Sequence, residues 1–190
     1  MNKKIGLFGG SFNPIHNSHI AIIKKLLKSN LVDEVWIMPA RKHAFNKKMA
    51  SVKDRLAMIQ IAIEGLKKVK ICVVEINAEG KNYTSDTLKK LRKKYKYEFI
   101  LINGSDTIQQ IKKWHKYKAV LSEAKFIIFK RRSYSFKKIR QMKILKIIGG
   151  IKSNSSTDVR KRILEGKSIK NLVPAKIAGY ISKKRLYRNI

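Results

Sequence analysis

Short apolar runs alternate with amphipathic stretches along the chain, and this alternation predicts the secondary structure. Runs rich in Ile, Val and Phe predict strands at residues 5–8, 34–38, 69–76, 99–102, 126–129 and 144–148. Helical spacing predicts apolar helix faces at Ile20, Ile23 and Leu27, at Leu56, Ile59 and Ile63, and at Leu88 and Leu91. Repeated βα units with strands that are apolar on both faces favour a doubly wound parallel sheet, an α/β fold in a single domain of residues 1–190.

Capping residues mark where the predicted helices begin and end. Ser51 and Asp54 have the pattern of a capping box that opens the second helix. The other boundaries are a cap at Thr84, a cap at Ser155 or Ser156, an end at Gly166, and Pro174 in the first turn of a terminal helix. We find no linker, repeat or low-complexity segment between these elements, which agrees with a single domain.

The first predicted strand runs directly into the sequence GGSFNPIHNSH, which starts at Gly9. Gly9 and Gly10 allow the backbone to turn tightly and to approach a ligand closely. The helix predicted from about Ser18 directs its free N–H groups and the positive end of its dipole to the same place, where His16 and His19 add donors. This combination predicts a phosphate-binding site, although neither the Walker A pattern nor the dinucleotide fingerprint is present in this segment.

A second glycine turn follows the fourth predicted strand, at Gly104, Ser105 and Asp106. In a doubly wound sheet, ligands bind beyond the carboxyl ends of the strands, where the strand order reverses. We therefore expect these residues to lie at the same edge of the sheet as GGSFNPIHNSH. Asp106 also has an alternative role as the cap of the next helix.

The chain of 190 residues has 45 Lys and Arg against 12 Asp and Glu, which gives a net charge of +33. A charge of this size raises the alternative of a basic nucleic-acid-binding protein. The lysines, however, occur in short clusters along the whole chain, with no basic tail and no aromatic-studded basic stripe. We therefore favour the compositional bias of an AT-rich coding sequence over a specific nucleic-acid surface, and expect the charge to attract anionic substrates.

The apolar runs and the cysteine content bear on the compartment. No apolar run approaches the roughly 18 residues that a membrane span needs, and the first run is interrupted too early for a signal peptide. The single cysteine, Cys72, has no partner for an internal disulfide and is expected to be buried. These features favour a cytoplasmic protein without a membrane partner.

Two segments carry a family resemblance. GGSFNPIHNSH is similar to the G-x-[ST]-F-[DN]-P-x-H-x-G-H signature of the nucleotidyltransferase superfamily, and NSSTDVR at 154–160 is similar to its second element, [IV]-S-S-T-x-[IV]-R. Three further segments, at 82–88, 102–117 and 172–188, resemble the bacterial nicotinate-nucleotide adenylyltransferases. The resemblance implies a Rossmann-like nucleotidyltransferase fold that transfers the adenylyl group of ATP, with Mg²⁺, to nicotinate mononucleotide, giving deamido-NAD and pyrophosphate.

The resemblance also implies which residues bind ATP. His16, His19 and Arg160 are expected to act on the phosphates during catalysis. The full set expected to contact ATP is Gly9, Gly10, Ser11, Phe12, His16, His19, Gly104, Asp106, Ser155, Ser156, Thr157 and Arg160. The serines and threonine of this set also have a plain explanation as helix caps. No residue is assigned to a protein-bound metal, because no third ligand stands at a supporting spacing beside the two histidines.

The same resemblance implies how nicotinate mononucleotide is bound. Trp114 is expected to stack on the pyridine ring, or alternatively to pack against a helix, and backbone N–H groups near Thr84 and His115 are expected to bind the nicotinate carboxylate. Lys47 is our interpretation of the family's loop lysine, because that loop is rewritten here. Ser18 stands where the family has glycine and is interpreted as a helix N-cap unless the position requires a positive φ.

Two other functions remain alternatives. Phosphopantetheine adenylyltransferases share both superfamily motifs, but the chain length and the segments around Asn82 and Trp114 disfavour them. A basic nucleic-acid-binding protein is supported by charge alone. The sequence leaves open whether nicotinate or nicotinamide mononucleotide is preferred, and whether the protein is a homo-oligomer.

Overall fold

The computed structural model describes residues 2–41, 49–80, 82–131, 139–151 and 154–188. These residues contain a six-stranded parallel sheet with the order β3-β2-β1-β4-β5-β6. The strands are β1 (Lys4–Gly10), β2 (Glu34–Pro39), β3 (Val69–Ile71), β4 (Glu98–Gly104), β5 (Lys125–Phe129) and β6 (Lys143–Ile148). The prediction of a doubly wound α/β sheet is confirmed.

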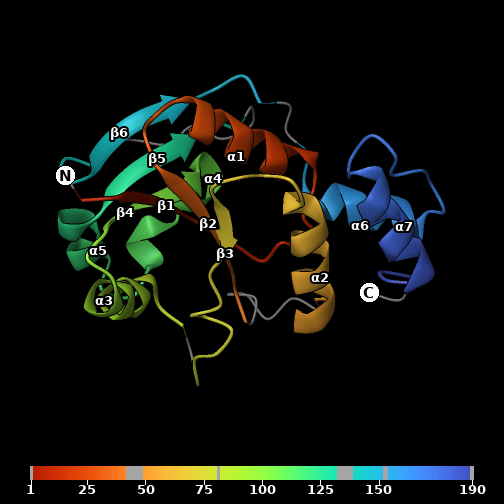
Figure 1. The fold of residues 1–190 in the computed structure, drawn as a ribbon, viewed down its shortest axis with the longest axis horizontal. Helices are drawn as coiled ribbons and strands as arrows, with labels where there is room; N and C mark the ends of the chain where they lie inside the picture. The colour runs from red at the N-terminus through yellow and green to blue at the C-terminus, as the bar shows by residue number, and fades with distance from the viewer. Residues whose placement is uncertain (1, 42–48, 81, 132–138, 152–153, 189–190) are drawn as a thin grey trace.

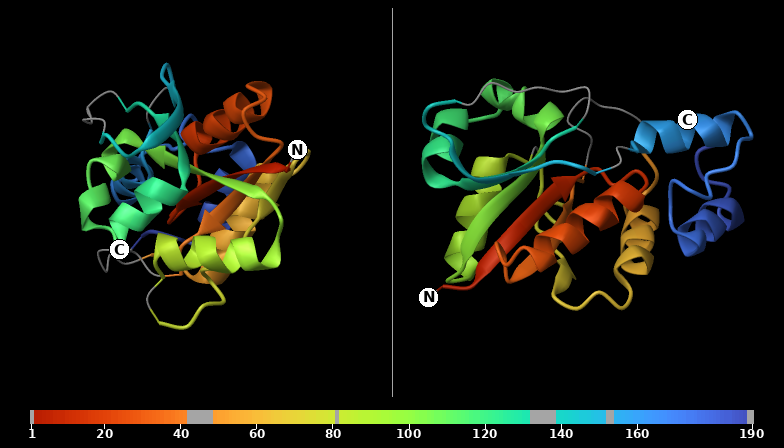
Figure 2. Two further views of the ribbon diagram at one scale, coloured as in Figure 1. Left: turned by 90° about the vertical axis from the view of Figure 1, so that its left-hand side faces the viewer. Right: turned by 90° about the horizontal axis from the view of Figure 1, so that it is seen from above.

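Helices cover both faces of the sheet (Figure 1). One face is covered by α1 (Asn17–Lys28) and α2 (Val52–Ile63), and α6 (Ser156–Leu164) and α7 (Ala175–Lys183) extend the same apolar core beyond α2. The other is covered by α3 (Thr84–Lys94), α4 (Ser105–Ile108), the 3₁₀ helix η1 (Ile111–Lys113) and α5 (Tyr117–Glu123). In two orthogonal views, α6 and α7 lie at the end of the molecule away from α3 and α5 (Figures 1 and 2). No helix among the described residues has the length and apolar character needed to cross a bilayer.

The side chains of each central strand alternate between the two cores. In β2, Val35 and Ile37 pack with α1 and α2, whereas Trp36 and Met38 pack on the opposite face. Trp36 is 7% exposed and its indole N–H donates to Glu34 Oε2 at 2.9 Å. Because both faces are covered, the strand appears in the sequence as an uninterrupted apolar run.

The third strand is shorter than the predicted range 69–76. The Cys72 N–H still donates to the Ile37 carbonyl at 2.8 Å, which extends the β2–β3 ladder by one bond. The next bond of a parallel ladder would need an N–H from Pro39, which has none. The chain therefore leaves the sheet and turns, with the Asn77 N–H donating to the Val73 carbonyl at 3.0 Å.

The helix boundaries agree with the sequence at most positions. Ser51 caps α2, Ser155 caps α6 and Gly166 ends the last turn with φ +65°, as predicted. Thr84 is the first residue of α3, and Tyr83 occupies the N-cap position instead. The buried face of α1 is also rotated from the predicted one and contains Ile22, Ile23 and Leu26.

Candidate active site

The strand order reverses between β1 and β4, which are hydrogen-bonded neighbours with Phe8 opposite Ile102. The chain after β1 continues into α1 on one face of the sheet, and the chain after β4 continues into α4 on the other. The segments that start at Gly9 and at Gly104 therefore lie together at the carboxyl edge, where ligands bind in sheets of this type. The prediction that both belong to this edge is confirmed.

The backbone of the first segment turns at Phe12 and not at the glycines. Gly9 and Gly10 are the last residues of β1, and neither has a positive φ, so the expected tight glycine turn is wrong. Phe12 has φ +45° and is 1% exposed. Its ring packs edge-on against Phe8 and His19, at centroid distances of 5.5 and 5.0 Å. A Cβ at position 10 would lie 3.3 Å from the Phe12 ring, so glycine there makes room for the ring.

The two histidines of this segment form one unit. Their rings stack with centroids 3.6 Å apart and an interplanar angle of 24°. His16 is the N-cap residue of α1 and is 1% exposed. Its backbone N–H donates to Nδ1 of His19 at 3.2 Å, which leaves the proton of neutral His19 on Nε2.

The surroundings of this pair keep both rings neutral. Burial lowers the pKa of His16 to about 3, and the positive charge of Arg131 acts in the same direction, against a smaller opposing effect of Asp158. The pKa of His19 is held well below its usual value by burial, and next by His16 and Arg131. Both histidines can therefore offer an N–H to a phosphate without bringing a positive charge of their own.

The second motif is hydrogen-bonded to the first. Nη1 of Arg160 donates to the carbonyl of Asn13 at 2.7 Å, and the Ser156 hydroxyl donates to the Pro14 carbonyl at 2.9 Å. Arg160 Nη2 also donates to the Thr157 hydroxyl at 3.3 Å. These side chains are occupied in joining and ordering the segments, whereas the N–H groups of Ser156 and Thr157 open α6 and have no partner within the helix. This helix terminus is suited to bind an anion.

Ser18 adds a further link between the two motifs. It is the second residue of α1, behind the N-cap His16, so the interpretation of Ser18 as an N-cap is wrong. Its hydroxyl accepts a hydrogen bond of 2.9 Å from the backbone N–H of Asn154. Serine at this position therefore binds the first residue of the second motif.

The segment after β4 forms an ion pair with the segment after β5. Gly104 takes the N-cap position of α4, so Asp106 lies inside the first turn and is not the cap. Oδ2 of Asp106 is 3.2 Å from Nη1 of Arg131, and the Arg131 backbone N–H donates to the Ser105 hydroxyl at 3.0 Å. A Cβ at position 104 would collide with the Asp106 carboxylate. Any side chain at this position would therefore displace the Asp106 carboxylate.

Arg131 is a candidate site residue that the sequence analysis missed. It follows β5 by two residues and lies near enough to lower the pKa of both histidines. Among 45 Lys and Arg residues, composition does not distinguish it. Its position directly after a predicted strand is the signal that could have identified it.

The residues expected at the pyridine side lie on two segments that meet. Tyr83, which precedes Thr84, stacks on His115 with ring centroids 4.2 Å apart and an interplanar angle of 27°. Trp114 is half-buried against the core formed by α3 and α5. Trp114 therefore has the packing role given above as the alternative to stacking on the pyridine ring. Part of its indole ring remains exposed. Lys47 lies outside the described residues.

The half-buried carboxyl of Glu75 supports the chain in front of Thr84. Glu75 accepts a hydrogen bond of 3.2 Å from the Thr87 hydroxyl, and the Glu75 backbone carbonyl accepts one of 2.6 Å from the Asn82 amide. Burial raises the pKa of Glu75, and the bond from Thr87 opposes this in part. These contacts tie the start of α3 to the segment that follows β3.

Comparison with known proteins agrees with this geometry. The sequence pattern of the family described as cytidylyltransferase-like matches residues 7–162. The chain belongs to this family. A protein of Halalkalibacterium halodurans is 36% identical over 98% of this chain and 92% of its own length, and one of Salinibacter ruber is 33% identical over 97% of both. Both are named "Probable nicotinate-nucleotide adenylyltransferase".

Solved structures agree with the same family. The Plasmodium falciparum nicotinic acid mononucleotide adenylyltransferase complexed with NaAD has a TM-score of 0.84 and 26% identity, over 97% of each chain. The same enzyme complexed with APC has a TM-score of 0.83. The resemblance to nicotinate-nucleotide adenylyltransferases is thereby confirmed, while the roles assigned to individual residues remain predictions.

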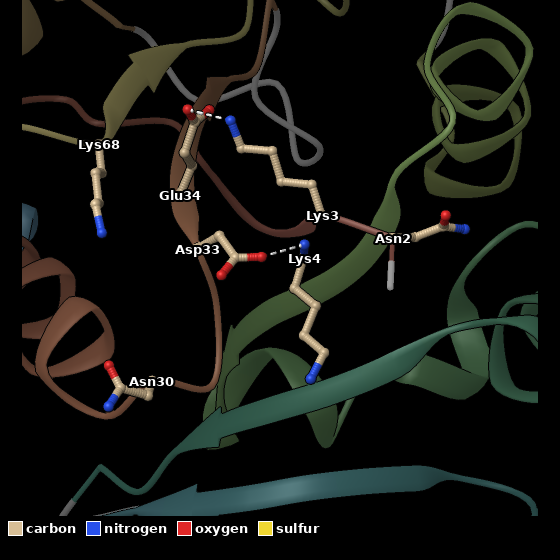
Figure 3. A pocket seen from close by; sticks show the side chains of 7 residues that line it. All are labelled: Asn2, Lys3, Lys4, Asn30, Asp33, Glu34 and Lys68. Atoms are coloured by element: carbon tan, nitrogen blue, oxygen red, sulfur yellow. Dashed lines mark hydrogen bonds and ion pairs between the residues drawn. The ribbon is translucent and has the colours of Figure 1, made fainter.

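A polar hollow of about 530 Å³ lies at the opposite, amino edge of the sheet (Figure 3). One of its two carboxylates, Glu34, is 2.7 Å from the Lys3 amine and 3.3 Å from that of Lys70. Burial raises the pKa of Glu34, but the hydrogen bonds from Lys3, Trp36 and Lys70 outweigh it and lower the pKa to about 2. Because the Glu34 carboxylate is already paired with lysines, we interpret this hollow as a structural ion-pair cluster.

Proposed function

We propose that this protein transfers the adenylyl group of ATP to nicotinate mononucleotide, giving nicotinate adenine dinucleotide and pyrophosphate. A phosphate oxygen of the mononucleotide forms the new bond to the α-phosphorus, and the bond from that phosphorus to the β-phosphate oxygen breaks. The names of the full-length relatives support the substrate pair. The reaction needs no protein nucleophile, only alignment of two anions and neutralisation of the leaving pyrophosphate.

The observation that carries this proposal is the direct joining of the two motifs at the carboxyl edge of the sheet. The bonds from Arg160 to Asn13 and from Ser156 to Pro14 hold α6, including its first residue, against the segment that precedes α1. Two helix N-termini, the neutral histidine pair and the cation of Arg131 then surround one region. Such a region offers N–H donors and positive charge to a triphosphate.

On this proposal, the ATP residues have distinct tasks. His16 and His19 donate hydrogen bonds to the phosphates, and the α6 amides together with Arg131 neutralise the charge that develops on pyrophosphate. Asp106 fixes Arg131 through the 3.2 Å ion pair. Trp114 stacks on the pyridine ring, with Thr84 and His115 near the nicotinate carboxylate, and Lys47 contacts a phosphate.

Magnesium enters this proposal with ATP. Among the residues that the structure describes, no group of three or more His, Cys, Asp and Glu is placed to hold a metal ion. Mg²⁺ commonly keeps several waters and binds through substrate phosphates with one or two carboxylates. The described residues therefore fit a magnesium ion that is coordinated mainly by the triphosphate, where it would neutralise phosphate charge. A cytoplasmic location is part of the same proposal.

Product analysis tests the proposed reaction. The protein is incubated with ATP, Mg²⁺ and, separately, nicotinate mononucleotide, nicotinamide mononucleotide or phosphopantetheine, and products are identified by mass spectrometry. We expect nicotinate adenine dinucleotide with release of one pyrophosphate. If phosphopantetheine alone gave a product, the superfamily assignment would stand and the assigned acceptor substrate would be wrong. A preference for nicotinamide mononucleotide would contradict the assignment of nicotinate mononucleotide.

A further inference from the structure

A fully buried arginine contacts the segment GGSFNPIHNSH, which starts at Gly9, from inside the protein. Arg55 belongs to α2 and is 1% exposed. Its Nη1 donates to the carbonyls of Ser11 at 2.9 Å and Ala40 at 2.8 Å. Two longer bonds of 3.3 Å run from Nη2 to the Arg41 carbonyl and from Nε to the Ala50 carbonyl. One guanidinium thus joins the segment after β1, the end of β2 and the start of α2.

The charge of Arg55 has no counter-ion in the described part of the chain, where no ion pair includes it. The neighbouring Asp54 carboxylate instead accepts hydrogen bonds from the Ser51 hydroxyl at 2.6 Å and the Tyr180 hydroxyl at 2.9 Å. Tyr187, 2% exposed, is close to Arg55, but burial raises the pKa of Tyr187 above its ordinary value and keeps the phenol neutral. A buried unpaired cation is costly, so its retention needs an explanation beyond packing.

The bond to Ser11 determines the direction of an amide at the site. Because Arg55 is buried, the Ser11 carbonyl that it binds points into the protein. In a trans peptide unit the C=O and the following N–H point in opposite directions, so the Phe12 N–H points away from Arg55. Phe12 itself has φ +45°, the conformation found in backbone nests that bind anions.

We propose that Arg55 is a positioning residue for the phosphates of ATP. It orients the peptide between Ser11 and Phe12, and its uncompensated charge favours an anion on the outer side of that peptide. The inference rests on the proposed function in one respect, because the anion is taken to be the triphosphate of ATP. A purely structural role would instead affect stability and leave phosphate affinity unchanged.

Binding of three ligands separates the two roles. Calorimetry on Arg55→Met and Arg55→Lys measures affinity for ATP, for pyrophosphate and for adenosine, which has no phosphate. We expect the Kd for ATP and pyrophosphate to rise at least roughly 10-fold in Arg55→Met, with a smaller rise in Arg55→Lys. The Kd for adenosine should change less than about 2-fold, because its contacts are unaffected.

Arg92 supplies the matched control. It lies on α3, across the sheet from α2, and its guanidinium also binds a backbone carbonyl, that of Glu123, at 2.9 Å. Arg92→Met should leave all three affinities within about 2-fold of the unmodified protein. This comparison removes the general effect of deleting one cation from a basic chain.

Two outcomes would overturn the positioning role. One is a folded Arg55 variant that binds ATP and pyrophosphate normally, and the other is an equal loss of ATP and adenosine binding. If Arg55→Met does not fold, Arg55→Lys decides, because lysine keeps the charge and length but cannot reach several carbonyls together. The test uses no mononucleotide, so an error in the proposed acceptor substrate would leave its result unaffected.

Discussion

The guanidinium of Arg160 donates a hydrogen bond of 2.7 Å to the backbone carbonyl of Asn13, across 147 positions of sequence. The contact ties the segment between β1 and α1 to helix α6. Arg160 therefore acts on the first motif through the backbone of that motif. The phosphate region is thus assembled from opposite ends of the chain, and changes in α6 should affect catalysis through the position of the first motif.

The neutral histidine pair leads to the first prediction. His16→Ala or His19→Ala should lower kcat by roughly 10²-fold or more, because each removes a preorganised donor to the phosphates. Pyrophosphate release measures the rate, and circular dichroism checks that each variant remains folded. Near-normal turnover in two well-folded variants would exclude the assigned role of this motif.

Most of the fold was predictable because the strands are covered on both faces. The apolar runs that became β1, β2, β4 and β5 need no tertiary information to be recognised. The end of β3 was missed because it depends on Pro39 of a neighbouring strand. The buried face of α1 was missed because Ile20, Ile22 and Ile23 are all apolar, and only packing selects between adjacent faces.

Site residues that belong to a local sequence motif could be predicted. Site residues that are identified only by their contacts in the folded protein could not. His16 and His19 stand in a segment whose glycines and helix start already indicate phosphate. Arg131 is brought to the site by its place after β5 and by its ion pair with Asp106, which belongs to a different strand–helix unit. Arg55 has the appearance of an ordinary charged helix residue until three separate carbonyl segments surround it.

The depressed histidine pKa values predict how stability depends on pH. Below the unfolded value of 6.5, the unfolded chain binds protons that folded His16 does not bind until about pH 3, so unfolding becomes easier as pH falls. Between about pH 7 and 5, His16 alone should lower the free energy of unfolding by roughly 2 kcal/mol, since the slope is about 1.4 kcal/mol per pH unit below 6.5. The effect of His19 has the same sign.

Urea unfolding at several pH values measures this dependence. The variant carrying both His16→Asn and His19→Asn should lose less stability than the unmodified protein over the same interval, because its unfolded chain gains fewer protons. Equal slopes for the two proteins would show that other groups control the acid sensitivity. The pKa of Glu34, about 2, matters only at lower pH, since its stabilisation is lost as pH falls below about 4.5.

Gly104→Ala should weaken ATP binding, because the added Cβ collides with the Asp106 carboxylate and displaces it from Arg131. Loss of one charge-assisted contact of about 1.5–3 kcal/mol corresponds to a rise of roughly 10- to 150-fold in the KM for ATP. Gly179→Ala is the matched control, since its Cβ meets nothing within 4 Å and α7 should be stabilised by up to about 1 kcal/mol. An unchanged KM in Gly104→Ala would remove Asp106 and Arg131 from the ATP site.

The net charge of +33 is predicted to have no specific nucleic-acid role. Duplex DNA should bind weakly and without sequence preference, and its affinity should fall steeply between about 50 and 200 mM salt because the attraction is to phosphates alone. Fluorescence anisotropy with two unrelated duplexes measures both properties. Tight binding to one of them at physiological ionic strength would support the nucleic-acid alternative.

Trp114→Ala tests the pyridine side of the site. If the half-buried indole stacks on the pyridine ring, the KM for nicotinate mononucleotide should rise far more than that for ATP. A stacking loss of about 1–3 kcal/mol corresponds to roughly 5- to 150-fold. His115→Ala offers a comparison, because it removes the ring stacked on Tyr83 while leaving the indole in place.

Tryptophan fluorescence provides a second measurement on the same variant. The protein has two tryptophans, and Trp36 is buried in the core beside Tyr95 at a ring distance of 5.2 Å. Nicotinate mononucleotide should therefore quench mainly Trp114, and Trp114→Ala should lose most of that response. Because Trp114 also packs against the core, a general loss of stability would lower affinity for both substrates together. Normal binding of the mononucleotide with a selective loss of ATP would instead assign Trp114 to the adenosine side.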